Sequence, residues 1–416
     1  MQKHQSTGST GRYGLPTEVV YCKRCVTSNQ RAQSRREHEV DPEHNTVDTL
    51  VIGEDGLCDA CRIDDAKRLI DWDARYKELE QLCDTHRRDD GRFDCIVPGS
   101  GGKDSVFQAH VLKDEFGMHP LTVTAPPTIP TEAGLRNFKA WCESYPNVAY
   151  KPSGEVHQVL TRLAFERLLH PFQPWVIMQQ NIGPRAANDH GVNLVFYGEH
   201  FADHGAGPIA DTQTSLRNKA VFTYENLEAL KFGGASLKEL RESYGFSMAD
   251  LNLYMPVRDI GEVQVHYLGY YVPWSVRGNE LYAGMRGFNP SPTRTSGSYT
   301  TGSSIDDGID TAHYWTAVNK TGLGRASFAA SQDIRAGVID RDLAVQLVRW
   351  YDLEYPQNID ELLDYLGMDR HRFDGLVAEG RPEHLFDEYG NLKHPVWEQK
   401  EHIVLGIDDA VIAPRS

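Results

Sequence analysis

The stretch Asp94-Cys95-Ile96-Val97-Pro98-Gly99-Ser100-Gly101-Gly102-Lys103-Asp104-Ser105 decides the fold of this chain. Its apolar run, Cys95 to Val97, predicts a short buried strand, and a glycine-rich turn follows it. Apolar residues at helical spacing then predict a helix over 104–116, with Gly117 as its C-cap. Strand, glycine loop and helix N-terminus together predict an anion site, because backbone N–H groups can approach phosphate oxygens there and the helix dipole favours negative charge.

This glycine loop differs from two common nucleotide-binding loops. Gly102-Lys103 is followed by Asp104 rather than by Ser or Thr, so the loop is not a Walker A motif. It also lacks the G-x-G-x-x-G pattern of dinucleotide-binding folds. The loop therefore indicates another class of phosphate-binding site.

From Phe93 onward, apolar strand patterns alternate with helical patterns. This alternation predicts an α/β fold with a parallel sheet, in which ligands bind beyond the carboxyl ends of the strands. Thr124 lies near the end of one expected strand, and Glu199, Asp203 and His204 follow another, so we expect them on the side of the glycine loop. The expected elements are strands over 121–125, 148–151 and 193–197, a strand within 265–274, and helices over 131–145 and 154–170.

Three further features leave more than one interpretation open. His200 and His204 could be metal ligands on one helix, but without a third ligand ordinary hydrogen-bonding histidines are favoured. The Gly/Ser/Thr-rich segment 287–308 predicts a long loop, which is typical of lids and binding loops. The turn 320–327 places Arg325 beside glycines at a helix start, and this pattern suits either a second anion site or a simple turn with a solvated arginine.

Two C-x-x-C pairs lie near the N-terminus: Cys22 with Cys25, and Cys58 with Cys61. Each pair can present two thiolates from a tight turn, and two such turns complete a tetrahedral all-sulfur zinc site. A closed four-cysteine site has no open position for a substrate, so we expect a structural zinc ribbon. A redox dithiol is the weaker alternative, since no βαβ pattern surrounds either pair.

Shifts in composition predict four regions. Residues 1–16 are polar and predict a flexible tail, whereas 17–90 hold the cysteine pairs, a polar surface loop over 29–45, and a helix over 63–83 with Leu69 on its apolar face. We expect one domain that contains the glycine loop over 91–340 and a C-terminal helical region over 341–416, with amphipathic helices as far as Gly380.

The composition narrows the class of protein. The 416 residues carry a net charge of −16, which disfavours an unassisted nucleic-acid binder. No stretch approaches the apolar length of a membrane span, and the N-terminus has no apolar core of a secretory signal. Seven cysteines, four of them at metal-binding spacing, suit a reducing compartment. We therefore expect a cytoplasmic protein.

The glycine loop resembles the PP-loop, Ser-Gly-Gly-x-Asp-Ser, of the ATP pyrophosphatase family, whose fold is adenine nucleotide alpha hydrolase-like. Residues Ser100 to Ser105 match this pattern completely. The resemblance implies cleavage of ATP between its α and β phosphates, with the loop holding the pyrophosphate.

Further motifs make the chain similar to the N-acetyl sugar amidotransferase family, and the resemblance covers nearly the whole chain after Pro16. One position departs from the family pattern, because His200 follows Gly-Glu where Asn or Asp is usual. The motifs are Tyr-Cys-Lys-Arg-Cys at 21–25, Gly-Leu-Cys-Asp-Ala-Cys at 56–61, Tyr-Gly-Glu at 197–199, Leu-Gly-Tyr-Tyr-Val-Pro-Trp at 268–274 and Gly-Leu-Gly-Arg-Ala at 322–326.

This resemblance implies that an acetamido group on a nucleotide-linked N-acetyl sugar becomes an acetamidino group, in the synthesis of lipopolysaccharide O-antigen or of pseudaminic and legionaminic acid derivatives. AMP would pass from ATP to the amide oxygen, and pyrophosphate would leave. Ammonia would then add to the carbon of this adenylated imidate and displace AMP. The implied cofactors are ATP, Mg²⁺ and a structural Zn²⁺.

The same resemblance gives roles to matching residues. Asp104, Lys103, Glu199 and Arg325 are the implied catalytic residues. Asp104 would hold Mg²⁺, with a helix N-cap as its alternative role. Glu199 would hold a second Mg²⁺ or steer ammonia. Arg325 would bind the phosphates of ATP or of a nucleotide-linked sugar. The implied nucleotide-binding residues are Ser100, Gly101, Gly102, Lys103, Asp104, Ser105, Thr124 and Gly198.

The source of ammonia lies outside the motifs of this chain. The family is associated with a separate glutaminase resembling that of histidine biosynthesis, often with a cyclase-like companion, so we expect such a partner. Free ammonium should replace this partner in vitro.

Two other functions stay open. A tRNA thiolation enzyme can also combine a zinc knuckle with a PP-loop, but Cys83, Cys95 and Cys142 lie in no motif. The other alternative is a non-catalytic zinc-ribbon adaptor that binds a nucleotide.

Overall fold

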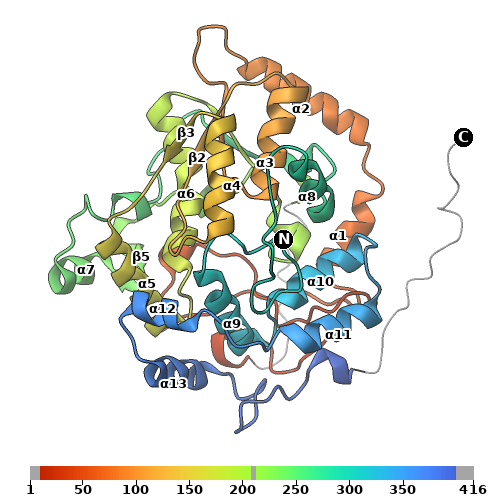
Figure 1. Cartoon of the computed structure of the whole chain (residues 1–416), viewed down its shortest axis with the longest axis vertical. Helices are drawn as coiled ribbons and strands as arrows, with labels where there is room; N and C mark the ends of the chain where they lie inside the picture. The colour runs from red at the N-terminus through yellow and green to blue at the C-terminus, as the bar shows by residue number, and fades with distance from the viewer. Residues whose placement is uncertain (1–9, 208–211, 400–416) are drawn as a thin grey trace, which may run out of the picture.

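The computed structural model describes residues 10–207 and 212–399. Five parallel strands form one sheet in the order β3-β2-β1-β4-β7, which confirms the predicted α/β class (Figure 1). Ile96 of the central strand pairs with Leu121 on one side and Val195 on the other. The strands are β1 Cys95–Pro98, β2 Pro120–Thr124, β3 Asn147–Ala149, β4 Leu194–Tyr197 and β7 Gln264–Tyr267.

Helices cover both faces of the sheet because successive side chains of a strand point to opposite faces. Ile96 packs in one buried cluster with side chains of α5 and α6, whereas Cys95 and Val97 pack in another with side chains of α2, α3, α4 and α8. These helices are α2 Trp72–His86, α3 Lys103–His110, α4 Glu132–Ser144, α5 Gly154–Leu168, α6 Gln173–His190 and α8 Val276–Gly284.

The remaining elements surround this core. Three of them, α11 to α13, lie where the sequence predicts amphipathic helices, and a short two-stranded sheet lies at the edge of α7. The helices are α1 Asp59–Lys67, α7 Leu237–Tyr244, α9 Ile309–Thr321, α10 Arg325–Arg335, α11 Arg341–Tyr351, α12 Ile359–Leu366 and α13 Arg370–Gly380, and the strands are β5 Lys231–Phe232 and β6 Ala235–Ser236.

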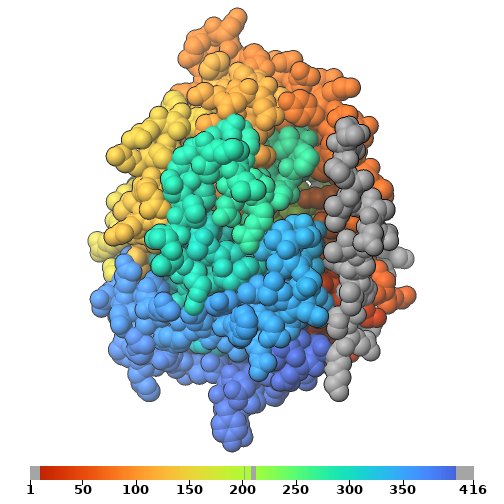
Figure 2. Space-filling view, turned by 45° about the vertical axis from the view of Figure 1, so that its right-hand side comes forward, coloured from red at the N-terminus to blue at the C-terminus, as the bar shows by residue number. Residues whose placement is uncertain are grey.

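The N-terminal cysteine pairs and the C-terminal helices share one buried cluster. All four cysteines pack there with Ala330 and Ile334 of α10 and with side chains of α11. In Figure 1, α1 accordingly lies beside α10 and α11, although they are distant in the sequence. On the face shown in Figure 2, the teal residues near 280–310 lie between the orange N-terminal part and the blue C-terminal helices. Among the described residues, no helix is long and apolar enough to cross a membrane.

The predicted single helix over 63–83 is wrong, because the chain forms two helices, α1 and α2, with a turn between them. The side chain of Asp71 caps α2 by accepting a hydrogen bond from the Ala74 N–H at 3.0 Å. This turn carries Leu69 out of the interior, and it is 88 % exposed instead of lying on a buried face. A local capping interaction therefore outweighs the apolar periodicity.

Two segments expected at the surface are packed instead. In the insert 29–45, His38 is fully buried and the Glu37 carbonyl accepts a hydrogen bond from the Gln173 side chain of α6 at 2.7 Å. In the expected tail, residues 1–9 lie outside the described part, but Leu15 is fully buried in a cluster with Leu385 and Phe386. Polar composition does not reveal these contacts, because the partners lie far away in the sequence.

Candidate active site

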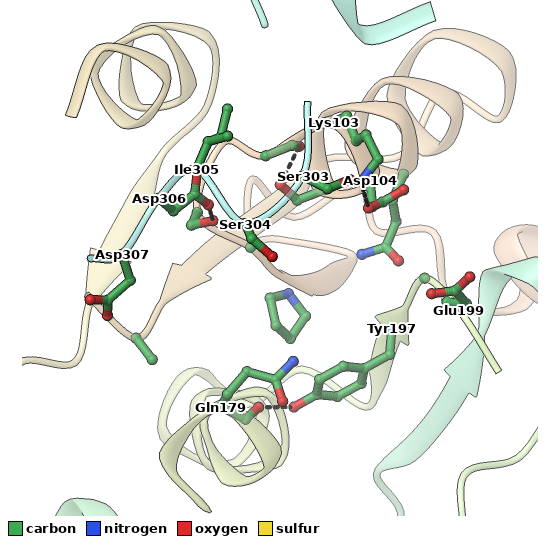
Figure 3. A pocket seen from close by; sticks show the side chains of 18 of the residues that line it. Lys103, Asp104, Gln179, Tyr197, Glu199, Ser303, Ser304, Ile305, Asp306 and Asp307 are labelled. Carbon is green, nitrogen blue, oxygen red and sulfur yellow. Dashed lines mark hydrogen bonds and ion pairs between the residues drawn. The ribbon is translucent and has the colours of Figure 1, made fainter. Parts of the chain in front are cut away.

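The strands β1, β4 and β7 end at a cavity of about 430 Å³ (Figure 3). In Figure 3, Ser303 to Asp307 lie on the same side as Lys103 and Asp104, opposite Gln179 and Tyr197. The predicted site residues that line the cavity are Ser100, Gly102, Lys103, Asp104, Ser105, Gly198, Glu199, His204 and Arg325. Residues distant in the sequence thus meet at the sheet edge where ligands of α/β folds gather.

Thr124 and Gly101 are not part of the cavity lining but shape the glycine loop. The Thr124 hydroxyl donates a hydrogen bond to the Gly99 carbonyl at 2.6 Å. Gly101 has a φ of +85°, and a Cβ there would lie 2.5 Å from the Asn137 carbonyl oxygen of α4. The loop therefore needs glycine at position 101 both for its backbone angle and for its contact with α4.

We expect Gly101→Ala to destabilise the fold by roughly 2 kcal/mol or more, since it adds left-handed strain to a steric overlap with backbone. Urea unfolding of the variant measures this loss. Gly154→Ala is the matched control, because Gly154 has no positive φ and a Cβ there meets nothing within 4 Å. Equal stability of the two variants would contradict this account.

The N-terminus of α3 points its backbone N–H groups toward the cavity without a side-chain cap. The helix begins at Lys103, and Gly102 occupies the N-cap position with no side-chain hydrogen bond. The alternative N-cap role of Asp104 is therefore wrong. The Asp104 carboxylate accepts hydrogen bonds from Lys103 Nζ at 2.8 Å and from Asn279 Nδ2 at 3.0 Å. Its side chain is 40 % exposed, so lone pairs stay available to a metal ion.

The long loop 287–308 forms as predicted, without a helix or strand, and brings a further carboxylate to the glycine loop. Ser100 Oγ donates a hydrogen bond to Asp306 Oδ2 at 2.7 Å. The other oxygen, Asp306 Oδ1, is buried and has no hydrogen-bond partner within residues 10–207 and 212–399. Burial raises the pKa of Asp306, and Ser100 and Lys103 partly offset this. In the sequence, the only sign of this additional carboxylate was the doublet Asp306-Asp307 at the end of the loop.

Two more carboxylates follow Asp306. Asp307 accepts hydrogen bonds from the backbone N–H groups of Ile129 at 2.8 Å and Ile309 at 3.1 Å, so it joins the loop to the start of α9. Burial raises the pKa of Asp307 to about 6. Burial, with the nearby charge of Asp307, raises the pKa of Asp310 to about 7.

The raised pKa of Asp310 predicts a pH-dependent stability. The folded state favours the protonated carboxyl, so the contribution is complete below the usual pKa of 3.8 and is lost as the pH rises through about 7. Across this window, the free energy of unfolding should fall by roughly 1–3 kcal/mol more in the wild type than in Asp310→Asn. Urea titrations at several pH values measure the difference, and parallel profiles would contradict it.

The residues after β4 separate into different environments. Glu199 lines the cavity, and its carboxylate contacts His204 Nε2. Burial, with Arg335 and Arg31, lowers the pKa of His204 well below its usual range. Asp203 was expected beside the glycine loop but forms an ion pair with Lys67 of α1 instead.

The structure also shows where the two histidines and Gly198 lie relative to Glu199. The two histidines do not form a shared metal site, because the His200 ring packs on Tyr267 with 4.5 Å between ring centroids whereas His204 faces Glu199. Gly198 permits a close contact, since a Cβ there would lie 2.3 Å from the Trp274 ring. Glycine at this position therefore lets Trp274 close one side of the cavity.

Two residues of the wall opposite the glycine loop, Gln179 and Arg217, were not predicted. The Tyr197 hydroxyl donates a hydrogen bond to the Gln179 carbonyl at 3.0 Å, and the guanidinium of Arg217 lies 4.1 Å from the Tyr197 ring centroid. Gln179 belongs to α6 and Arg217 to the segment before β5, and neither lies in a recognisable motif.

In the second glycine turn, Arg325 is available to a ligand in the cavity, but the N-terminus of α10 is not. The carboxylate of Asp352 accepts hydrogen bonds from the N–H groups of Gly324 at 3.0 Å and Ser327 at 2.9 Å, so the start of α10 is already capped. Arg325 nevertheless lines the cavity. Its Nη1 donates to the Tyr314 hydroxyl at 3.4 Å, and its buried Nε has no hydrogen-bond partner in the part of the chain that the structure describes.

The four predicted cysteine ligands form one buried cluster, which could bind a metal such as zinc. Sγ of Cys22 lies 3.8 Å from that of Cys61, and Sγ of Cys25 lies 3.7 Å from that of Cys58. Zinc–sulfur bonds of about 2.3 Å in a tetrahedron place the sulfurs about 3.8 Å apart. The donor set and spacing fit zinc.

Fold and site together define an α/β protein with a polar cavity at the carboxyl edge of a parallel sheet and a separate four-cysteine cluster. Residues 293–401 match a family model described as "LPS biosynthesis protein WbpG-like, C-terminal domain". This match supports a lipopolysaccharide or sugar biosynthesis family and suggests an enzyme.

One curated relative is similar over a short segment. It is "Uncharacterized protein MJ1599" of Methanocaldococcus jannaschii, which is 40% identical over 47 residues. The matched segment is 11% of this chain and spans 17% of the length of that relative.

Proposed function

We propose that this chain is an ATP-dependent amidotransferase that converts the acetamido group of a nucleotide-linked N-acetyl sugar into an acetamidino group. The observation that carries the proposal is the joint lining of one cavity by the PP-loop-like residues, the carboxylates of Asp104 and Glu199, and the guanidinium of Arg325. The family match over the C-terminal part points to the same area of metabolism.

The glycine loop would hold the two outer phosphates of ATP. The uncapped N-terminus of α3 leaves backbone donors for their oxygens, whereas Asp352 already occupies the corresponding donors of α10. Lys103 adds a positive charge within the same loop. These contacts leave the α-phosphate as the group that can be transferred.

Transfer of AMP solves the central chemical problem of the reaction. An amide carbon is a weak electrophile, so the amide oxygen first attacks the α-phosphorus, and the bond to pyrophosphate breaks. Ammonia then adds to the carbon, the bond from carbon to the oxygen of AMP breaks, and a proton is released. Mg²⁺, which Asp104 and Glu199 would hold, would offset charge on the phosphates. Much of the protein's contribution is positioning and electrostatic stabilisation.

The test traces the oxygen atom of the acetamido group by isotope labelling. Purified protein is incubated with ATP, Mg²⁺, ammonium and UDP-N-acetylglucosamine or other nucleotide-linked N-acetyl sugars that carry a heavy oxygen isotope in the acetamido group. We expect the label in AMP and a sugar in which NH replaces oxygen. Formation of ADP, or AMP without label, would contradict the proposal.

A tRNA thiolation enzyme remains the alternative. Such an enzyme needs cysteine chemistry at the phosphate-binding loop. The cavity lining among the described residues contains no cysteine, and Cys95 points into the core cluster on one face of the sheet. A parallel reaction with tRNA and a sulfur donor distinguishes the two functions.

The proposed source of ammonia is a separate glutaminase subunit. Free ammonium should replace this partner when the chain is assayed alone.

A further inference from the structure

A second, much smaller chamber adjoins the main cavity. Its volume is about 20 Å³, and it shares the side chain of His204 with the main cavity. Roughly 10–15 Å³ of such space is enough for one water molecule, so the chamber accepts one molecule of that size. Its lining residues are Thr27, Arg31, His204, Phe328, Ser331, Gln332 and Arg335.

The chamber is polar on the inside. Ser331 Oγ and Arg31 Nε are buried and have no hydrogen-bond partner among the described residues. Buried polar atoms of this kind are normally satisfied, often by a small molecule that donates and accepts hydrogen bonds. Apolar surface from Phe328 closes one side, with the Arg31 guanidinium 3.6 Å from its ring centroid.

The charges around the chamber favour a neutral occupant. Arg31 and Arg335 both line it, and among the described residues neither has a carboxylate within ion-pair distance. The proximity of Arg335 contributes to lowering the pKa of Arg31 to about 10, after the larger effect of burial. Two cations in so small a space repel an ammonium ion but not neutral ammonia.

One side chain separates the two spaces. His204 Nδ1 contacts the Gln332 side chain, which lines the chamber, and His204 Nε2 contacts Glu199, which lines the main cavity. A rotation of this imidazole would join the chamber to the site of the proposed reaction. Thr27, two residues after Cys25, also lines the chamber.

We propose that this chamber is the binding site and inner passage for ammonia, which reaches the adenylated imidate past His204. This proposal rests on the proposed function. It gives the zinc ribbon and α10 a shared role, because their packing forms the chamber wall. It also deepens the role of Glu199, which is the first carboxylate that ammonia meets.

The experiment fills the chamber from two different elements. Ser331→Leu and Thr27→Leu place an apolar side chain in it, and Thr85→Leu, on the exposed surface of α2, is the control that adds the same side chain outside the chamber. Two rates are measured for each protein: exchange of pyrophosphate into ATP with the sugar but without ammonium, and amidination with ammonium chloride. The first reports adenylation, and the second also requires ammonia. Melting temperature and zinc content show whether each variant folds.

We expect the KM for ammonium to rise at least about tenfold in both chamber variants, with the exchange rate within about twofold of the wild type. Thr85→Leu should resemble the wild type in both rates. Normal exchange with an unchanged KM for ammonium in a folded chamber variant would overturn the chamber proposal alone. Absence of sugar-dependent exchange in the wild type would overturn the proposed function, and the chamber proposal with it.

Discussion

Asp104→Asn should lower the rate of sugar-dependent pyrophosphate exchange by roughly 10²–10³, which is the scale for removal of one electrostatic contact to a transition state. The substitution keeps the shape of the side chain and can keep the hydrogen bond with Asn279, but it removes the negative charge beside Lys103. Lys103 loses its ionic partner, and under the proposed function the binding of Mg²⁺ would weaken. The exchange assay measures the effect on adenylation before ammonia enters the reaction.

Asp114→Asn is the matched control. Asp114 lies in the turn that continues α3, its side chain is 45 % exposed, and it is absent from the cavity lining. We expect this variant to keep normal exchange and both variants to keep their melting temperatures. If Asp104→Asn exchanges pyrophosphate as fast as Asp114→Asn, then Asp104 is not part of the reaction.

Cys58→Ser should cause the largest loss of stability. Cys58 is fully buried in the cluster that joins the four cysteines to α10 and α11, and its Sγ lies 3.7 Å from that of Cys25. Binding of zinc by four thiolates contributes roughly 10 kcal/mol or more in small zinc domains, so a weakened site lowers the free energy of unfolding substantially. We expect loss of zinc and a lower melting temperature, measured by metal analysis and calorimetry.

Cys142→Ser separates this effect from general cysteine chemistry, since Cys142 is exposed and lies outside the cluster. That variant should keep its zinc and its melting temperature. Addition of a strong zinc chelator to the wild type should reproduce the Cys58→Ser result. A metal-free wild type that is as stable as the purified protein would show that the cluster has no structural role for zinc.

Much of the fold could be predicted from sequence because its signals are local. The run Cys95 to Val97 is apolar, and the glycines after it need no partner to be recognised as a turn. Short-range spacing likewise identified the cysteine pairs, whose sulfurs do meet. Where two local signals competed, the prediction was wrong, as at Leu69, because Asp71 caps a new helix and interrupts the periodic pattern.

The candidate site could be predicted only in part. The glycine loop and the strand ends are local features of the sequence. Asp306, however, reaches Ser100 through a loop with no regular structure, so no periodicity in the sequence predicts the position of Asp306. The same limit applies to the start of α10, whose donors are occupied by Asp352 from a turn after the next helix.

By itself, the sequence determined the parallel α/β class, the glycine loop before α3 and the two C-x-x-C pairs, because these depend on neighbours in the chain. Only the tertiary structure decided that Asp306, Glu199 and Arg325 line one cavity, and that His204 lines both this cavity and the small chamber next to α10. Such contacts arise when distant segments bury their surfaces together, and their free energy belongs to the packed core rather than to any one segment.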